Sequence, residues 1–433
     1  MTGLDVLADA KASHLGPSLN PEHASTFARR QPGPALADTL AQIDMARLRG
    51  HRLGRLRAQL KEHDYGACVL SDGINVRYAT GSRNMQIWTI RNAARYVFVP
   101  AEGPVVLFDF GGCEHLSKGL ETIDEIRPAT TYFFFTSGPH VEERAKRWAA
   151  EIADLVRLHC GGNRRLALDR VNPVGAAALA AHGLELFDAN PAVEHARAIK
   201  SADEIACMYA AISVCETGFS RMRDALEPGL TENELWSILH QTNIAMGGEY
   251  IETRLLSSGS RTNPWFRESS QRVIRAGDLV AVDSDMYGLF GYFADISRTF
   301  FCPPGRPSAE QGTLYALAHE QVHRNMELLR PGVSFREFSE KSWKMPEAYV
   351  PNRYMTLVHG AGLSGEYPYI AYPQDFAAKG YDGLVEENMT LCVESYIGGV
   401  GGAEGVKLEQ QVLVTQGGPE PLSTFPFEAE LTG

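Results

Sequence analysis

The sequence predicts two domains, an α/β domain followed by a larger α+β domain. Its 433 residues suit roughly two to three domains of ordinary size. In the first half of the chain, short apolar runs typical of strands are interspersed with helical patterns. In the second half, pairs of long helical patterns alternate with strand hairpins, which indicates a curved antiparallel sheet covered by helices.

The composition restricts the classes of partner. The formal net charge of −12 and the pI near 5.6 argue against nucleic acid and anionic membranes. The seven cysteines form no CxxC pair, and their odd number indicates free thiols in a reducing compartment. The sequence shows neither a secretory signal pattern nor the run of about 20 apolar residues that a membrane span needs. We therefore expect a cytoplasmic protein.

The first half is predicted to contain an arm and the α/β domain. Residues 1–40 are rich in Ala, Pro, Ser and Gly without a period, and are expected to form an irregular arm. The α/β domain is assigned to residues 41–198 and opens with a basic amphipathic helix at 44–63. Strands are expected at 67–71, 75–81, 94–100, 104–110 and 165–169, helices at 141–159 and 173–182, and a loop at 81–88.

Residues 199–433 are predicted to form the α+β domain. Two capping boxes, Ser201 with Glu204 and Thr231 with Glu234, open helices that end near residues 226 and 246. A strand is expected at 250–257, and further helices at 309–329 and 335–345.

The segment 279–301, LVAVDSDMYGLFGYFADISRTFF, places three carboxylates beside two strand-like runs. Asp283 ends the first run, and Asp285 shares its face because strand side chains alternate. The return run follows Asp295 and can bring that residue opposite them. Converging carboxylates repel one another strongly unless a cation lies between them. Arg298 is the only Lys or Arg in the segment, and its side chain is expected on the outer face.

Three further candidate ligands follow along the chain: His359, Glu394 and Glu409. Each acid alone also fits a solvated strand end, so the prediction depends on their order and combination. Three Asp, one His and two Glu suit two divalent ions bridged by carboxylates. We expect two divalent metal ions, with iron favoured and manganese, zinc or cobalt as alternatives.

The order of these residues resembles the metallopeptidase superfamily with the pita-bread fold, which includes methionine aminopeptidase, aminopeptidase P, prolidase and creatinase. The resemblance implies a pita-bread C-terminal domain, a creatinase-like N-terminal domain, and metal ligands at Asp283 or Asp285, Asp295, His359, Glu394 and Glu409. The peptidases usually show eleven residues from the first to the second Asp. Here the separations are twelve from Asp283 and ten from Asp285, so both residues are expected to contact metal.

The closer resemblance is to the peptidase-like bacterial dimethylsulfoniopropionate lyases, the group called DddP. The matching stretches are IETRLLSSGSRTNPWF, DSDMYG, ADISRTF, HGAGL, CVES and KLEQQVL. The resemblance implies cleavage of a small zwitterionic substrate to dimethyl sulfide and acrylate. It also fits a departure from the peptidases, which need two further histidines. Trp265 and Glu366 stand in those places here, and His319 and His323 are expected to be surface or packing residues.

The lyase reading needs a base and a pocket for a sulfonium cation. Tyr354 matches a tyrosine of the lyase pattern, and a nearby metal can lower the pKa of a phenol. The lyases carry an acid six residues past the metal His, where this chain has Gly365, so the adjacent Glu366 is the second candidate base and Asp285 a third catalytic candidate. An aromatic wall would hold the sulfonium. Its candidates, each of which also fits simple packing, are Trp265, Phe266, Tyr292 and Trp88.

Three functions remain open at this point. The first is a metal-dependent carbon–sulfur lyase, and the second is a metal-dependent C–N hydrolase of a small zwitterion. The third is a binding module without catalysis, against which the complete set of candidate ligands argues. We expect a homodimer in which Trp88 forms one wall of a site shared between subunits.

Overall fold

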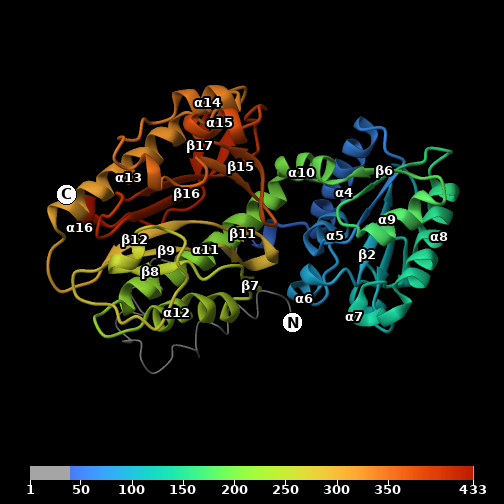
Figure 1. Ribbon diagram of the computed structural model, residues 1–433, viewed down its shortest axis with the longest axis horizontal. Coiled ribbons are helices and arrows are strands. Elements are labelled where there is room, and N and C mark those ends of the chain that lie inside the picture. Colours follow the sequence, from blue (N-terminus) through green and yellow to red (C-terminus); the bar gives the residue numbers. More distant parts are fainter. Residues whose placement is uncertain (1–39, 433) are drawn as a thin grey trace. The chain divides into compact units, whose positions relative to one another are not determined.

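The computed structural model describes residues 40–432, so the predicted arm, apart from residue 40, lies outside the described residues. The described part of the chain separates into two compact units, residues 44–198 and residues 199–432, and residues 40–43 are grouped with the second (Figure 1). They are called the N-terminal and the C-terminal domain below. Within residues 40–432, no helix combines the length and the hydropathy that crossing a bilayer requires.

The N-terminal domain is built on one mixed sheet. Its strands are β1 (Ala67–Leu70), β2 (Tyr96–Pro100), β3 (Val106–Asp109), β4 (Glu125–Pro128), β5 (Arg165–Leu168) and β6 (Glu185–Asp188). They lie in the order β4-β3-β2-β1-β5-β6, with β1–β2 and β2–β3 antiparallel and the other pairs parallel. The helices are α4 (Met45–Glu62), α5 (Gly73–Thr80), α6 (Gln86–Arg91), α7 (Phe134–Ser137), α8 (Val141–His159), α9 (Pro173–Ala180) and α10 (Asn190–Ala198).

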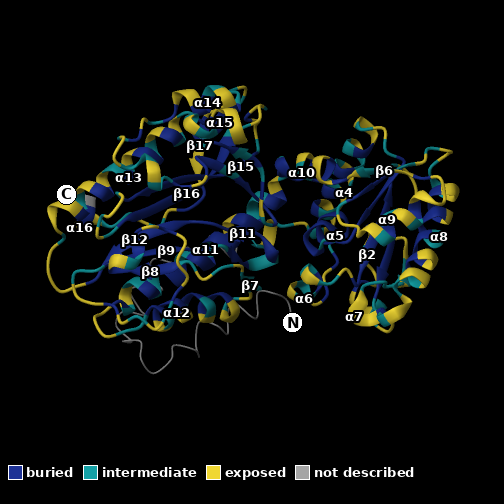
Figure 2. Cartoon of the chain, viewed as in Figure 1, coloured by how far each residue is buried: buried dark blue, intermediate teal, exposed yellow. Residues whose placement is uncertain are grey.

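Helices cover this sheet and bury its apolar side chains. Trp148 and Ile152 of α8 pack with Val69, Phe98 and Val106 of the strands in one buried cluster. Burial of each such aliphatic side chain contributes about 1.5–3 kcal/mol. Figure 2 shows the central strands in the buried colour, whereas the edge strands β4 and β6 are partly exposed, as are the outward faces of the helices. The predicted α/β architecture is confirmed.

Two segments of this domain differ from the sequence prediction. The strand expected at 75–81 is wrong, because residues 75–80 belong to helix α5 and Gly81 is its C-cap. The Asp72 side chain caps that helix by accepting hydrogen bonds from the backbone N–H groups of Ile74 and Asn75. Every residue of α5 is buried, so packing overrides the strand preference of its Val, Tyr and Thr. The loop expected at 81–88 is also partly wrong, since α6 begins at Gln86.

The C-terminal domain combines long helices with antiparallel sheets. Its helices are α11 (Ala202–Ala225), α12 (Glu232–Ala245), α13 (Ala309–Glu327), α14 (Phe335–Lys341), α15 (Pro373–Lys379) and α16 (Ala429–Thr432). Its strands are β7 (Tyr250–Ile251), β8 (Leu256–Ser258), β9 (Leu279–Asp283), β10 (Met286–Tyr287), β11 (Phe293–Ala294), β12 (Ser297–Phe301), β13 (Val358–Ala361), β14 (Gly365–Ile370), β15 (Thr390–Ile397), β16 (Val406–Thr415) and β17 (Gly418–Pro421). The predicted α+β class is confirmed.

Local sequence signals set the ends of the long helices. Both predicted capping boxes are present at the starts of α11 and α12. The strand expected at 250–257 is instead two short strands in different sheets. The three sheets have the orders β11-β10-β7, β12-β9-β8 and β14-β13-β15-β16-β17.

Strands β12 and β16 bring two of these sheets together. The Thr299 hydroxyl donates to the Lys407 carbonyl at 2.8 Å and accepts from the Lys407 backbone N–H at 3.1 Å. Helix α13 covers β15 and β16 on the other side (Figure 1). The ends of β9 and β12 therefore face the middle of β15 and β16, where the candidate ligands lie.

Arg298 projects from the face of β12 opposite to Ser297 and the aspartates, as expected, but that face is buried inside the C-terminal domain. Its side chain is buried and donates to the carbonyls of Glu409 and Phe425, both at 2.7 Å. The guanidinium also lies 4.2 Å from the centroid of the Phe427 ring. The segment 423–428 packs over Arg298. This contact joins residues more than 120 positions apart, so the local strand pattern could not predict it.

Candidate metal centre

Three aspartates reach the centre from the ends of short strands. Asp283 ends β9 and pairs with Ser297 of β12. Asp285 follows two residues later with a φ of 39°, at the point where the chain leaves β9 for β10. Asp295 lies between β11 and β12. The left-handed conformation of Asp285 is tolerated by aspartate better than by most residues.

The other candidate ligands come from three neighbouring strands of the five-stranded sheet. Glu394 of β15 lies opposite Glu409 of β16, and His359 of β13 lies opposite Cys392 of β15. Cross-strand partners share a face of a sheet. Because Cys392 and Glu394 are two residues apart, all four side chains project from the same face.

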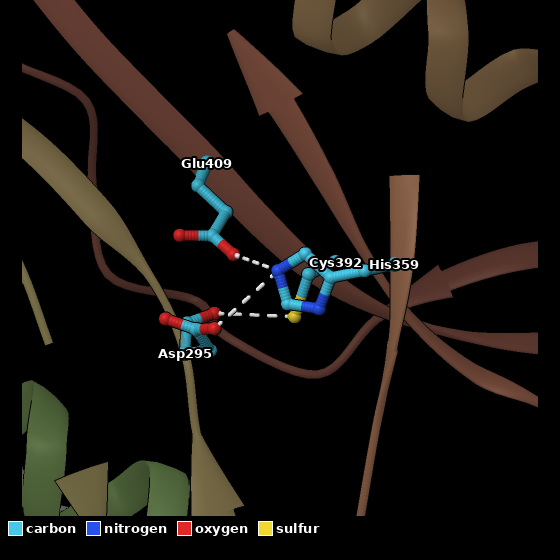
Figure 3. Close-up of side chains that lie close together, drawn as sticks. All are labelled: Asp295, His359, Cys392 and Glu409. Atoms are coloured by element: carbon cyan, nitrogen blue, oxygen red, sulfur yellow. Dashed lines mark hydrogen bonds and ion pairs between the residues drawn. The ribbon is translucent and has the colours of Figure 1, made fainter. Parts of the chain in front are cut away.

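His359 presents its Nε2 atom to carboxylates (Figure 3). Its Nδ1 atom lies 3.0 Å from the Gly360 carbonyl, and a proton there leaves the Nε2 lone pair for a metal. Nε2 lies 3.3 Å from Glu394 Oε1, 3.5 Å from Asp295 Oδ2 and 3.6 Å from Glu409 Oε1. Donors about 2.1 Å from one ion and roughly 90–110° apart are separated by about 3.0–3.4 Å. These distances suit ligands of a shared ion.

The candidate ligands form two overlapping sets. In the first, donor atoms of Asp295, His359, Cys392 and Glu409 lie within 4.8 Å of one another. In the second, donor atoms of Asp283, Asp285 and Asp295 satisfy the same limit. Asp295 belongs to both sets, as a bridging carboxylate would.

Lys407 brings a cation into the centre that the sequence analysis missed. Its Nζ atom lies 2.7 Å from Glu394 Oε2, 3.2 Å from Asp283 Oδ2 and 3.4 Å from Glu409 Oε2. It also lies 2.6 Å from the Ser297 hydroxyl. The Lys407 side chain is fully buried. Because β16 alternates, Lys407 and Glu409 share a face, a signal that was available in the sequence.

Three buried carboxylate oxygens that Lys407 does not contact are suited to bind a metal ion. The buried atoms Asp283 Oδ1, Asp295 Oδ1 and Glu409 Oε1 have no hydrogen-bond partner. A buried carboxylate oxygen without a partner is costly, so such atoms require an occupant. On Asp283 and Glu409 the other oxygen is held by Lys407. The donor set of carboxylates and one imidazole therefore fits divalent cations.

The electrostatics of the centre favour added positive charge. Burial raises the pKa of Asp295 well above its usual value, and the carboxylates of Glu409, Asp285 and Asp283 raise it further. Burial likewise raises the pKa of Asp285, with Asp283 as the second cause. One ammonium cannot neutralise this many buried carboxylates, so they ionise together only with further cations between them.

The candidate catalytic and aromatic residues differ in their distance from this centre. The Tyr354 ring centroid lies 4.6 Å from Lys407 Nζ, and the ring stacks on Phe266 with centroids 5.2 Å apart. Phe266 is 48% exposed and has a φ of 72°, a strained backbone for this residue type. Trp265 is buried, with its centroid 6.2 Å from that of Tyr396.

The remaining candidates have other partners. Tyr292 is buried, and its hydroxyl donates to Glu204 at 3.0 Å. The Glu366 carboxylate is 1% exposed and lies 2.5 Å from Lys200 Nζ. Trp88 lies in the N-terminal domain, where its ring packs against Phe110 at a centroid distance of 5.6 Å. The rings of His319 and His323 contact each other with their centroids 3.9 Å apart, as expected for packing residues.

The two domains match two known family models. Residues 52–199 match the creatinase/prolidase N-terminal domain, and residues 206–416 match metallopeptidase family M24. Among solved structures, the Xaa-Pro dipeptidase from Bacillus anthracis superposes with a TM-score of 0.70 at 22% identity, covering 88% of this chain and 99% of that chain. Dipeptidase PepE from Mycobacterium ulcerans gives 0.70 at 21% identity, covering 89% and 98%. Such low identities establish the fold alone.

Two relatives are much more similar in sequence. The dimethylsulfoniopropionate lyase DddP of Roseovarius nubinhibens is 40% identical over 399 residues, which cover 91% of this chain and 90% of the relative. The lyase of the same name from Roseobacter denitrificans is 39% identical over 397 residues, which cover 90% and 88%. The protein is therefore an enzyme on a metallopeptidase fold, and it belongs to the DddP family of dimethylsulfoniopropionate lyases.

Proposed function

We propose that this enzyme cleaves dimethylsulfoniopropionate to dimethyl sulfide and acrylate by metal-dependent β-elimination. The observation that carries the proposal is the position of Tyr354. Its ring lies 4.6 Å from Lys407 Nζ, which in turn contacts three of the candidate ligands. A phenol oxygen beside a carboxylate-binding metal centre is suited to removing a proton from the substrate. Membership of the lyase family supports the same reaction.

The centre is proposed to hold two divalent ions, with iron favoured over manganese, zinc and cobalt. Asp295, His359, Glu394 and Glu409 would hold one ion, and Asp283, Asp285 and the shared Asp295 the other. When bound, the ions act as Lewis acids that fix the substrate carboxylate and stabilise the charge developing on it as the neighbouring carbon loses its proton. Lys407 orients the carboxylates from behind through their second oxygens.

Tyr354 is proposed as the base. Its phenolate oxygen takes the proton from the carbon next to the carboxylate, and that electron pair forms the carbon–carbon double bond. The bond from the next carbon to sulfur breaks, and its electron pair leaves with neutral dimethyl sulfide. Burial raises the pKa of Tyr354 well above its usual value, the Glu394 carboxylate adds to this, and Lys407 opposes it. The phenolate therefore depends on the cationic charge of the centre.

Glu366 is the weaker of the two proposed bases. Its carboxylate is buried in an ion pair with Lys200 at 2.5 Å. To accept a proton from the substrate, the carboxylate would have to give up this pair. Leaving one partner of a buried ion pair alone costs about 3–5 kcal/mol. Asp285 is proposed to hold metal, because its carboxylate lies with those of Asp283 and Asp295.

An aromatic surface is proposed to hold the sulfonium group. Phe266 is the best candidate, because its ring is half exposed and stacks on Tyr354. A cation over such a ring gains about 0.5–2 kcal/mol. Trp265 and Tyr292 are buried against other partners, Tyr396 and Glu204, and are weaker candidates for this surface. Trp88 is proposed to contribute to the same aromatic surface from a partner subunit.

The oligomeric state and compartment are proposals as well. A homodimer is supported by exposed apolar side chains of the N-terminal domain, among them Ile87, Phe134 and Phe135. A reducing, cytoplasmic location is supported by the seven free cysteines.

Gas chromatography of the headspace over purified, metal-loaded enzyme tests the proposed reaction. We expect dimethyl sulfide and equimolar acrylate from dimethylsulfoniopropionate, and no cleavage of a Xaa-Pro dipeptide. The variants Asp295→Ala and Glu409→Ala should lose both activity and metal. Absence of dimethyl sulfide at high enzyme concentration, with metal bound, would overturn the lyase proposal and favour a hydrolase.

A further inference from the structure

A thiol lies among the candidate ligands, although the proposed function gives it no role. Cys392 stands two residues before Glu394 in β15, and both side chains are buried. Its register partners are His359 in β13 and Gln411 in β16. Since Gln411 is two residues from Glu409, the thiol shares a sheet face with both flanking ligands.

The sulfur is close enough to contact an ion in this centre. Cys392 Sγ lies with donor atoms of Asp295, His359 and Glu409 inside a mutual limit of 4.8 Å. Donors on opposite sides of one ion, at about 2.1–2.3 Å, are roughly 4.4 Å apart. Figure 3 shows the sulfur beside the His359 ring and on the side of the two carboxylates. The other metal set, Asp283 with Asp285 and Asp295, contains only oxygen donors.

Unpartnered atoms point to a ligand at the same place. The buried oxygens Asp295 Oδ1 and Glu409 Oε1 have no hydrogen-bond partner. The contact that the thiol itself makes is weak, a donation to the Asp295 carbonyl at 3.8 Å. These two carboxylate oxygens are therefore not satisfied by hydrogen bonds within the protein, and they lie beside the thiol.

We propose that Cys392 Sγ is an additional metal donor in the set formed by Asp295, His359 and Glu409. The two metal positions would then differ in their donors. The first would have sulfur, nitrogen and oxygen donors, and the second, formed by Asp283, Asp285 and Asp295, only oxygen donors. Sulfur favours zinc, cobalt and iron, whereas all-oxygen donors suit manganese and magnesium. The inference rests on the metal centre of the proposed function, but it does not depend on which substrate is cleaved.

X-ray absorption spectroscopy of the full-length protein loaded with zinc or cobalt tests the proposal directly. We expect a sulfur scatterer at about 2.3 Å from the metal, with fractional occupancy because one of the two ions carries the thiol. The scatterer should disappear in Cys392→Ser. It should persist in Cys302→Ser, a matched control, because Cys302 is also buried and its thiol donates to the Pro303 carbonyl, at 3.5 Å, and belongs to neither set of candidate ligands.

A competition titration gives a second readout without activity. In Cys392→Ser, zinc affinity should fall by roughly 10–100-fold, while manganese affinity changes much less. If the wild-type spectrum shows only oxygen and nitrogen neighbours, the proposal is wrong even if the variant fails to fold. Dimethyl sulfide release is measured on the same wild-type sample. Release of dimethyl sulfide without a metal–sulfur contact would overturn the assignment of Cys392 alone. A metal–sulfur contact without release would overturn the lyase proposal alone. Failure of the protein to bind metal would overturn both.

Discussion

Lys407 Nζ lies 2.7 Å from Glu394 Oε2, so a buried ammonium is part of the carboxylate centre itself. Burial tends to lower the pKa of Lys407, but Asp283, Glu394 and Glu409 raise it well above its usual value. The lysine therefore stays charged throughout the neutral range. It holds one oxygen of each of these carboxylates and leaves the other oxygen for a different partner.

Replacing Lys407 with methionine should destabilise the metal-free protein more than the metal-loaded one. Removal of the ammonium leaves buried carboxylates unpaired, which costs about 3–5 kcal/mol. Bound cations offset part of that cost, since they supply charge to the same carboxylates. Urea denaturation with and without metal measures both values, and Lys407→Arg, which keeps the charge, is the control. Equal losses in the two states would contradict the contact network described here.

Replacing Tyr354 with phenylalanine should abolish most turnover while keeping the metal. Loss of a general base lowers kcat by roughly 10²–10⁴-fold. The ring is retained, so the stack with Phe266 and the KM should change little. Steady-state kinetics with metal analysis measures both. Tyr315→Phe is the control, a buried tyrosine whose hydroxyl accepts from the Glu428 N–H at 2.7 Å. A kcat near the wild-type value in Tyr354→Phe would rule out this base.

Replacing Phe266 with leucine should weaken substrate binding. Loss of a cation–π contact worth about 0.5–2 kcal/mol corresponds to a KM increase of roughly 2- to 30-fold. Leucine keeps an apolar side chain at the same strained backbone position, so the change isolates the aromatic ring. Phe266→Tyr keeps a ring and should bind substrate nearly as the wild type does. An unchanged KM in the leucine variant would remove Phe266 from the sulfonium site.

Metal should be lost on acidification at a higher pH than ordinary carboxylates would require. Burial and then the neighbouring carboxylates raise the pKa values of Asp285 and Asp295. These groups therefore take up protons while the pH is still above about 4, the usual value for Asp. Each proton bound to a ligand competes with metal, so affinity falls as the pH falls. The absorption of the cobalt-loaded enzyme across a pH series measures this. Retention of full metal down to pH 4 would contradict it.

Replacing Arg298 with methionine should strongly destabilise the C-terminal domain. The change leaves the carbonyls of Glu409 and Phe425 without their donors, at about 1–3 kcal/mol for each buried group. Thermal and urea unfolding measure the loss. Arg324→Met is the control, because the Arg324 side chain is 62% exposed and should change stability by less than about 0.5 kcal/mol. Similar stabilities of the two variants would contradict the role of Arg298.

Local residue patterns determined much of this structure. The capping boxes at Ser201 and Thr231 start their helices as expected, because capping depends on residues three apart in the chain. Asp283 and Asp285 lie together as expected, but the expected cause, strand alternation, is wrong, because Asp285 lies beyond the end of β9 with a left-handed backbone. The order of acids and one histidine indicated a metal centre, and Asp283, Asp285, Asp295, His359 and Glu409 do lie together in the structure.

Only the tertiary structure decided which strand faces meet and what completes the centre. Residues 73–80 became a helix because packing and the Asp72 cap outweigh their strand preference. Lys407 and Cys392 reach the ligands through the register of β13, β15 and β16 and the contact between β12 and β16. Alternation within a strand predicts only which residues share a face. Which segment packs against that face depends on contacts between residues far apart in the chain, and local sequence patterns do not predict such contacts.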